Sequence, residues 1–214
     1  MTPDPSLTFA SFVPTAGSRR ARGTCHALAT RRAVPASPVL LCGPVASGKT
    51  HLLHAVANEL RLASREAHLT TVEEWRTDLV AALSRTEGTD RFHERHAALD
   101  ALLVDDLHVL PGLVATQQEL ARYLASLALR GCPVVLALGG AMSLWPLLHA
   151  VREATGGLGL RIVRLAKPTA RETRVILATR FGTVSSPILD RASRSAGDVR
   201  VAMGAVNAAS AHGQ

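Results

Sequence analysis

The amino-acid sequence predicts an α/β fold whose sheet is mainly parallel. Five short apolar runs alternate with longer segments of helical periodicity, the order that a parallel sheet with crossover helices requires. The first run ends at a glycine-rich segment, residues 43–50, and the third ends at Asp105 and Asp106. With 214 residues, 47% of them hydrophobic, the chain is long enough to bury a core without disulfide or metal staples.

Each expected strand is a short apolar run bounded by Gly, Pro, acidic or other turn-forming residues. Because such runs carry no polar face, we expect strands buried on both sides by helices. The strands are expected at Val39–Cys42, His68–Thr71, Ala101–Val104, Pro133–Leu138 and Leu160–Leu165.

The expected helices begin at recognisable signals. One begins at Lys49, directly after the glycine-rich segment, and three more begin at a Thr followed three residues later by Glu, the spacing of a capping box. These pairs are Thr71 and Glu74, Thr116 and Glu119, and Thr169 and Glu172. From Pro187 onward, the pattern predicts two short helices broken near Gly197.

The composition excludes several classes of protein. Aromatic residues make up 3% of the chain, too few for a stacking platform that binds single-stranded nucleic acid. Cys25, Cys42 and Cys132 are widely spaced and form neither a disulfide framework nor a zinc pattern. Residues 1–13 lack the features of a signal peptide. We therefore expect a cytoplasmic protein in a reducing compartment.

One stretch, Gly131–Val151, has no charged residue over a length that could span a membrane. It contains two prolines and several glycines, and such breakers seldom occur this densely in a spanning helix. We interpret it as a buried strand, a loop and a short helix, and we expect no membrane association.

The positive charge of the chain is unevenly distributed. The formal net charge is +7, and residues 152–200 hold ten basic residues against four acidic ones, a net charge of +6. This segment permits weak, non-specific contact with DNA phosphates, but a solvated basic surface explains it equally well. Arginine dominates, and Lys49 and Lys167 are the only lysines.

Residues 43–50 match the complete phosphate-binding pattern G-x-x-x-x-G-K-[ST]. In such a P-loop the backbone N–H groups surround phosphate oxygens and the following helix directs its positive end at the anion. Lys49 is then expected to reach the β- and γ-phosphates of ATP or ADP, and Thr50 to bind Mg²⁺. The loop positions expected to contact nucleotide are Gly43, Val45, Ala46, Ser47 and Gly48.

Asp105 and Asp106 follow the third apolar run, about fifty residues after the P-loop. In P-loop proteins an Asp at the end of such a strand holds Mg²⁺. We therefore expect Asp105 on the metal side, together with Thr50. Asp106 is the candidate catalytic residue that polarises the attacking water.

Other conspicuous residues are given structural interpretations. His51 and His54, like His93 and His96, have a spacing that a metal could use, but no Cys or acidic partner completes a site. We expect them on solvated helix faces. Trp75 is expected in the core. The arginines of residues 19–32 are expected to be solvated or to touch phosphates.

Several of these segments together resemble a known family, the AAA+ domain of the bacterial replication initiator DnaA and its relative Hda. The stretch Leu41–Leu60, with its Gly-Lys-Thr-His-Leu-Leu-His-Ala centre, is similar to the family's P-loop region. Leu-Leu-Val before Asp105 and Asp106 resembles its Walker B motif. Thr8-Phe9-Ala10-Ser11-Phe12 resembles its N-terminal Thr-Phe-x-x-Phe segment. Residues 197–207 resemble its sensor-2 helix.

The resemblance implies a five-stranded parallel sheet flanked by helices and followed by a small helical lid. It divides the chain into an N-terminal segment and helix (1–37), a P-loop core (38–166) and the lid (167–214). By the same match, Arg200 would reach the nucleotide phosphates from the lid. Residues 8–13 would lie near the base of the bound nucleotide.

The chain departs from the family pattern at two positions. Where the family usually places a polar sensor-1 residue, the sequence has residues 137–140, Ala-Leu-Gly-Gly, with no polar side chain. Where it places an arginine finger, the sequence has residues 154–157, Ala-Thr-Gly-Gly, and Arg152 is the nearest substitute. Any hydrolysis is therefore expected to be weak or partner-dependent. The chain also ends where the initiator's helix-turn-helix domain would begin.

The leading hypothesis is an ATP- or ADP-binding protein of DNA replication initiation or its control, with a DnaA-like AAA+ partner. Oligomerisation, where it occurs, is expected to depend on nucleotide. The alternative is an AAA+ ATPase that acts as a helicase loader or transposition helper. A plain P-loop kinase explains residues 43–50 but not the Asp-Val-Arg segment at 198–200.

Overall fold

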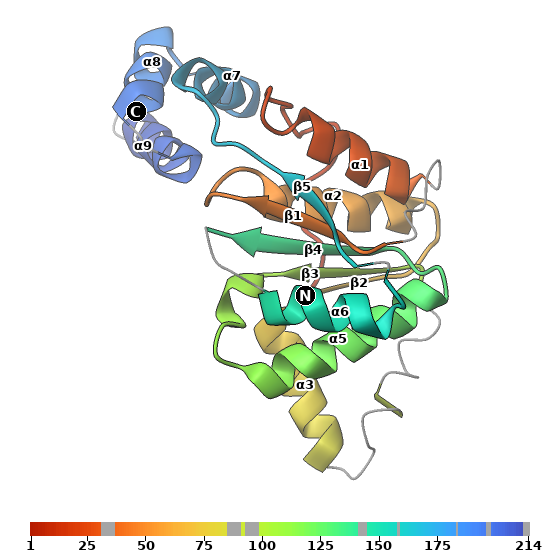
Figure 1. The fold of residues 1–214 in the computed structure, drawn as a ribbon. Coiled ribbons are helices and arrows are strands. Elements are labelled where there is room, and N and C mark those ends of the chain that lie inside the picture. The colour runs from red at the N-terminus through yellow and green to blue at the C-terminus, as the bar shows by residue number, and fades with distance from the viewer. Residues whose placement is uncertain are drawn as a thin grey trace.

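The centre of the molecule is a sheet of five parallel strands in the order β2-β3-β4-β1-β5 (Figure 1). The computed structural model describes residues 1–30, 37–84, 91–92, 99–140, 145–157, 159–182, 184–195 and 198–211. The strands are β1 (Val39–Gly43), β2 (Ala67–Thr71), β3 (Ala101–Asp105), β4 (Val134–Gly139) and β5 (Arg161–Arg164). All five expected strands are confirmed, and no strand end is shifted by more than one residue.

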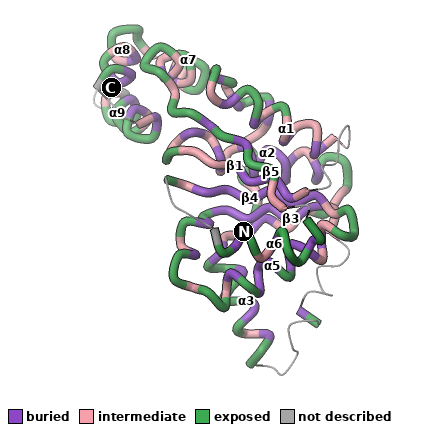
Figure 2. The backbone as a smooth tube through the Cα atoms, in the orientation of Figure 1, coloured by how far each residue is buried: buried purple, intermediate pink, exposed green. Residues whose placement is uncertain are grey.

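Two helical layers cover the sheet, so its middle strands are buried on both faces (Figure 2). Successive side chains alternate between the layers: Leu41 and Leu103 join one buried cluster, and Leu40 and Leu102 join the other. The first cluster includes α1 (Arg19–Ala29) and α2 (Lys49–Leu62). The second includes α3 (Val72–Ser84), α5 (Val114–Leu129) and α6 (Trp145–Ala154), and the 3-10 helix η1 (Leu107–Val109).

Three further helices lie beyond the carboxyl ends of the strands (Figure 1). They are α7 (Ala170–Phe181), α8 (Ser186–Ser195) and α9 (Val199–Ala211). They share a small buried cluster of their own, which consists of Leu177, Leu189, Ala192, Ala202 and Val206. We refer to these three helices as the lid. The predicted break between the last two helices is present, and Gly197 itself lies outside the described residues.

Two of the three expected capping boxes form. The carboxylate of Glu74 accepts from Thr71 N and the Thr71 hydroxyl accepts from Glu74 N, each at 3.1 Å, and Thr169 and Glu172 cap α7 in the same way. The third prediction is wrong, because α5 begins at Val114 and its N-cap is Leu113. Glu119 instead accepts from Arg122 one turn later, at 2.6 Å.

The uncharged stretch Gly131–Val151 contains β4 and the beginning of α6, with residues 141–144 outside the described part. The expected strand and helix are therefore present. Among the helices that the structure describes, none combines the length and apolar character needed to cross a membrane.

Candidate functional site

The P-loop connects the end of β1 at Gly43 to the beginning of α2 at Lys49. Two of its glycines are sterically required. A Cβ atom at Gly43 would lie 2.7 Å from the carbonyl oxygen of Leu165, and one at Gly48 would lie 2.8 Å from the ring of Phe12. Gly48 also has a φ of 97°, in the left-handed region that favours glycine. The P-loop therefore packs closely against Leu165 and Phe12. Its backbone leads directly into the N-terminus of α2.

The ammonium group of Lys49 lies inside this loop. It donates to the carbonyl oxygens of Gly43 at 2.9 Å and Pro44 at 2.7 Å, and only 7% of the residue is exposed. Burial lowers the pKa of Lys49, and the nearby Asp105 carboxylate acts in the opposite direction. A cation with so little solvation is well placed to exchange its carbonyl partners for the oxygens of a bound anion.

Asp105 and Asp106 occupy different environments at the end of β3. Asp105 is buried, and its Oδ1 accepts from Asp106 N at 2.8 Å. Asp106 is exposed, has a left-handed φ of 59° and pairs with Nδ1 of His108 at 3.5 Å. Burial of part of the Asp106 carboxyl, together with the neighbouring charge of Asp105, raises its pKa.

The oxygens at this site fit Mg²⁺. Thr50, in the first turn of α2, carries a hydroxyl, and Asp105 carries a buried carboxylate. Hard oxygen donors of this kind, few in number and supplemented by phosphate and water, are the usual environment of Mg²⁺. Among the described residues, no group of three or more His, Cys, Asp or Glu side chains is arranged to hold a metal.

The lid lies across a cavity from the P-loop. This cavity has a volume of about 170 Å³, and its lining combines loop residues with residues from the lid and the connection before α7. The lining residues are Val45, Ala46, Lys167, Pro168, Ala170, Thr173, Ser193, Arg194, Asp198 and Val199. The core and the lid thus form the two walls of one site.

Arg200 lies in the first turn of α9, next to this cavity but not in its lining. The side chain of Asp198 accepts from Arg200 N at 2.6 Å and so begins the helix. The Arg200 side chain is exposed, and its charge adds to burial in lowering the pKa of Lys49. Arg200 is therefore close enough to the P-loop for its charge to act there.

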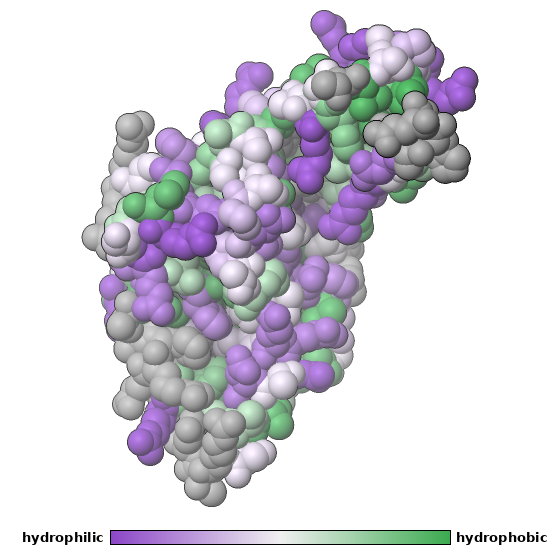
Figure 3. Space-filling view, turned by 180° about the vertical axis from the view of Figure 1, so that it is seen from behind, coloured by the Kyte–Doolittle hydropathy of each residue, from purple (hydrophilic) through white to green (hydrophobic). Residues whose placement is uncertain are grey.

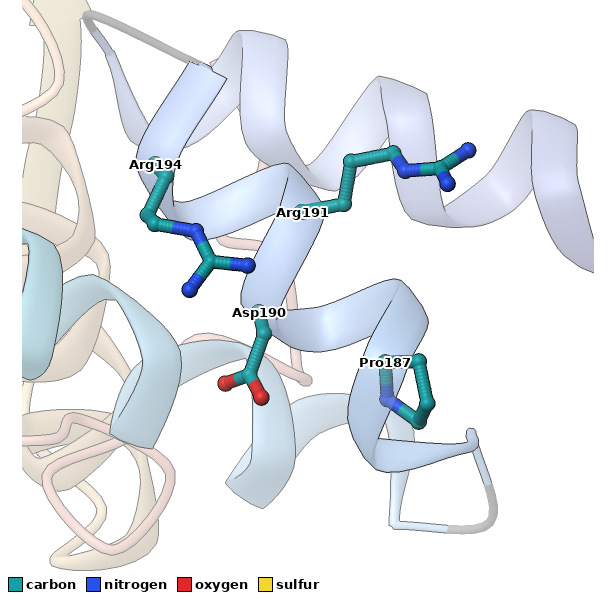
Figure 4. A pocket seen from close by; sticks show the side chains of 4 residues that line it. All are labelled: Pro187, Asp190, Arg191 and Arg194. Atoms are coloured by element: carbon teal, nitrogen blue, oxygen red, sulfur yellow. The ribbon is translucent and has the colours of Figure 1, made fainter.

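A wider hollow of about 560 Å³ lies on the lid surface and contains no P-loop residue. It is lined by Pro187, Asp190, Arg191 and Arg194, all from α8 (Figure 4). Asp190 and Arg194 extend from one side of the helix, whereas Arg191 extends from the other (Figure 4). Because all of its walls belong to one helix, we assign the site to the smaller cavity.

The N-terminal residues 4–18, which we call the strap, run along α2. His51 Nε2 lies 2.9 Å from the carbonyl oxygen of Thr8, and Asp4 N donates to Nδ1 of His54 at 2.9 Å. The ring of Phe12 meets that of His51 edge-on, with 5.0 Å between centroids. The expectation that His51 and His54 are solvated is therefore wrong, because both rings hold the strap and His54 is buried. His93 and His96 lie outside the described residues.

A family model described as the bacterial DnaA ATPase domain matches residues 4–140, more than half of the chain. The chain belongs to this DnaA family. The matched residues include the strap, the P-loop, β3 with its two aspartates, and β4.

Individual DnaA proteins show the same relationship. The chromosomal replication initiator protein DnaA of Chloroflexus aggregans is 37% identical over 118 residues, which are 54% of this chain and 24% of that protein. The chain therefore spans about a quarter of the length of this relative.

Two solved structures share the fold. Domain III of the Thermotoga maritima replication initiation protein DnaA has a TM-score of 0.80 at 23% identity, covering 95% of this chain and 87% of that one. AMPPCP-bound DnaA from Aquifex aeolicus has a TM-score of 0.78 at 22% identity, covering 95% and 65%. The arrangement of strands, helices and lid is thus that of a DnaA-type AAA+ domain.

The two departures from the DnaA pattern can be located in the structure. Gly139 pairs with Gly43 of the P-loop, and Gly140 N donates to the Gly43 carbonyl at 3.3 Å. The end of the expected sensor-1 segment, residues 137–140, thus lies beside the P-loop, and the segment offers no polar side chain. Arg152 is exposed in the last turn of α6.

Two further expectations have mixed outcomes. Trp75 is buried, as expected. Arg22 is not simply solvated, because its guanidinium donates to the Phe9 carbonyl at 3.1 Å and so helps to hold the strap. Arg31 and Arg32 lie outside the described residues.

Proposed function

We propose that this DnaA-family chain binds ATP or ADP between the P-loop and the lid. The observation that carries the proposal is the cavity of about 170 Å³ shared by Val45 and Ala46 of the loop and Asp198 and Val199 of the lid. The loop that forms one wall of this cavity leads into the N-terminus of α2 and encloses the Lys49 ammonium group, and both a helix N-terminus and a cation favour an anion. The Aquifex aeolicus structure, which is DnaA bound to AMPPCP, supports a nucleotide as the ligand.

Each side chain then has a definite part in binding. The backbone of residues 43–48 surrounds the phosphates, Lys49 leaves its carbonyl partners to pair with them, and Arg200 approaches from the lid. Thr50 and Asp105 hold Mg²⁺, which when bound neutralises charge on the β- and γ-phosphates. Asp106, exposed and with a raised pKa, is the candidate for orienting an attacking water.

We place this nucleotide-dependent module in the initiation of DNA replication or its control. The match to DnaA proteins supports this role. The proposed partner is a DnaA-like AAA+ protein, and association with it is expected to depend on the bound nucleotide. Arg152 is exposed in this chain. In such an assembly it would be available to contact a neighbour's nucleotide.

The alternative is an ATPase that loads or remodels another machine, as a helicase loader or transposition helper does. Gly139 and Gly140 provide no polar side chain beside the P-loop, and this favours slow turnover by the isolated chain. Steady-state turnover with Mg²⁺, measured alone and with DNA, separates the two functions. Rapid turnover by the isolated chain would favour the alternative.

The proposal is tested by identifying and titrating the nucleotide. We expect ATP or ADP to copurify at close to one molecule per chain, and calorimetric titration of the stripped protein to give one site. Arg200→Ala should weaken binding. Arg191→Ala should not, because Arg191 extends from the side of α8 opposite Asp190 and Arg194 (Figure 4) and does not line the cavity. Absence of binding by the folded wild-type chain would overturn the proposal.

A further inference from the structure

Glu172 connects the lid to the strap. Its Oε1 accepts from Ala16 N at 2.8 Å, across 156 positions of sequence. Its Oε2 accepts from both the backbone N and the hydroxyl of Thr169, each at 2.9 Å, which caps α7. Both carboxylate oxygens are therefore engaged, one with the strap and one with the lid.

The far end of the strap contacts the P-loop. Phe12 packs on Gly48 so closely that an added Cβ would lie 2.8 Å from its ring, and Thr8 contacts His51 of the P-loop helix. Near Ala16, Ala166 N donates to the Gly17 carbonyl at 3.2 Å. Figure 1 shows the chain before α1 running beside α7. The strap therefore links the P-loop to the start of the lid.

The three lid helices are tied to one another. Leu177 of α7 belongs to the same buried cluster as Leu189 of α8 and Ala202 of α9. The guanidinium of Arg174 on α7 also pairs with the carboxylate of Asp190 on α8. Because a close-packed interior has low compressibility and transmits strain, we expect a shift of α7 to move α9 and, with it, Arg200.

We propose that Glu172 is a positioning residue of the nucleotide site: it holds the lid against the strap so that Arg200 faces the P-loop. The inference rests on the proposed nucleotide binding and adds a residue that touches no nucleotide itself. Its action is through Arg200, and this makes it distinguishable from a purely structural role.

Glutamine is the informative replacement at position 172. It has one acceptor oxygen where glutamate has two, so it is unable to serve both Ala16 N and the Thr169 cap. Thr169→Ala is the matched control, because it removes the hydroxyl that accepts from Glu172 N at 3.2 Å but leaves the bond to Ala16. The two variants should lose similar thermal stability and differ in nucleotide affinity.

The test is a double-mutant cycle on ATP affinity, measured by calorimetry with Glu172→Gln and Arg200→Ala. In the chain with Arg200 intact, we expect Glu172→Gln to raise the Kd about three- to tenfold, the effect of one hydrogen bond. In the Arg200→Ala background, it should change the Kd by less than about twofold. Thr169→Ala should leave the Kd of both backgrounds unchanged.

Equal effects of Glu172→Gln in both backgrounds would overturn the inference while leaving nucleotide binding in place. Loss of binding by the wild-type chain would instead remove the proposed function. If Glu172→Gln does not fold, Ala16→Pro replaces it, because proline removes the N–H donor and leaves the α7 cap intact. An affinity for ATP equal to that of the wild type in folded Ala16→Pro would also overturn the inference.

Discussion

Lys49 is held by two carbonyl oxygens of its own loop, so its charge is positioned before any anion arrives. We expect Lys49→Ala to weaken ATP and ADP binding by about 1.5–3 kcal/mol, or about 10- to 150-fold, the range for a hydrogen bond to a charged group. Calorimetric titration measures this. Arg191→Ala, which removes a cation on α8 outside the lining of the proposed nucleotide cavity, should change the Kd by less than about threefold.

The Lys49→Ala variant should keep its fold, because the lysine pairs with loop carbonyls and not with the core. Circular dichroism and a thermal melt check this. Wild-type affinity in a folded Lys49→Ala protein would remove Lys49 from the site.

The carboxylate of Asp105 is buried at the end of β3. We expect Asp105→Ala to abolish the part of nucleotide affinity that depends on Mg²⁺ and to leave most of the Mg²⁺-free affinity unchanged, because we propose this carboxylate as a ligand of the metal and not of the phosphates. Titrations with and without EDTA separate the two parts. Asp105→Asn is the control, since it keeps the oxygen that accepts from Asp106 N and loses the negative charge. Equal losses of nucleotide affinity with and without Mg²⁺ would contradict the metal role of Asp105.

At the scale of elements, the strap is expected to give the fold a dependence on pH. Burial lowers the pKa of both His51 and His54 from an ordinary value of 6.5. The folded protein therefore prefers neutral rings, and below pH 6.5 the unfolded chain binds more protons. Stability contributed by these rings is present above pH 6.5 and is lost as the pH falls below it.

Urea unfolding between pH 7.5 and 5 measures this dependence. The midpoint should fall with pH in the wild-type chain and fall less in a variant with His51→Gln and His54→Gln. His149→Gln, which changes a ring on α6 that is 55% exposed, is the control and should keep the wild-type profile. An unchanged profile in the double variant would show that these rings are not responsible.

The elements that the sequence predicted well are those whose signal is local. Strands buried on both faces appear as apolar runs, and β3 and β4 lie where those runs lie. Thr116 and Glu119 had the right spacing for a cap but lie within α5, which begins at Val114 with Leu113 as its N-cap. The roles of His51 and His54 were missed for a related reason: their partners lie more than 40 positions away.

At the scale of the whole molecule, the site divides into a predictable and an unpredictable half. The P-loop and the two aspartates are short motifs at strand ends, so their chemistry is visible in the sequence. The cavity opposite them depends on how the lid is docked. Glu172 was expected to cap α7, and it does, but its second oxygen binds Ala16. The capping spacing predicts the first contact and contains no information about the second.

The last prediction concerns the basic segment 152–200, which carries ten basic residues against four acidic ones. Some of its arginines interact within the protein: Arg174 pairs with Asp190, and the charge of Arg200 acts on Lys49 of the P-loop. Others are exposed, Arg161 and Arg164 on β5 among them. On the face seen from behind, hydrophilic side chains are interspersed with apolar ones over both core and lid (Figure 3).

Because these exposed arginines lie on several elements, we expect DNA binding that depends on phosphate charge and not on base sequence. Affinity should be weak and fall steeply with salt, with a slope of about −0.9 in log K against log salt for each phosphate contacted. Fluorescence anisotropy with specific and scrambled duplexes, at low and physiological salt, measures both properties. Arg161→Gln with Arg164→Gln should reduce the slope without altering nucleotide affinity, whereas sequence-selective binding that persists at physiological salt would require a recognition element other than this dispersed charge.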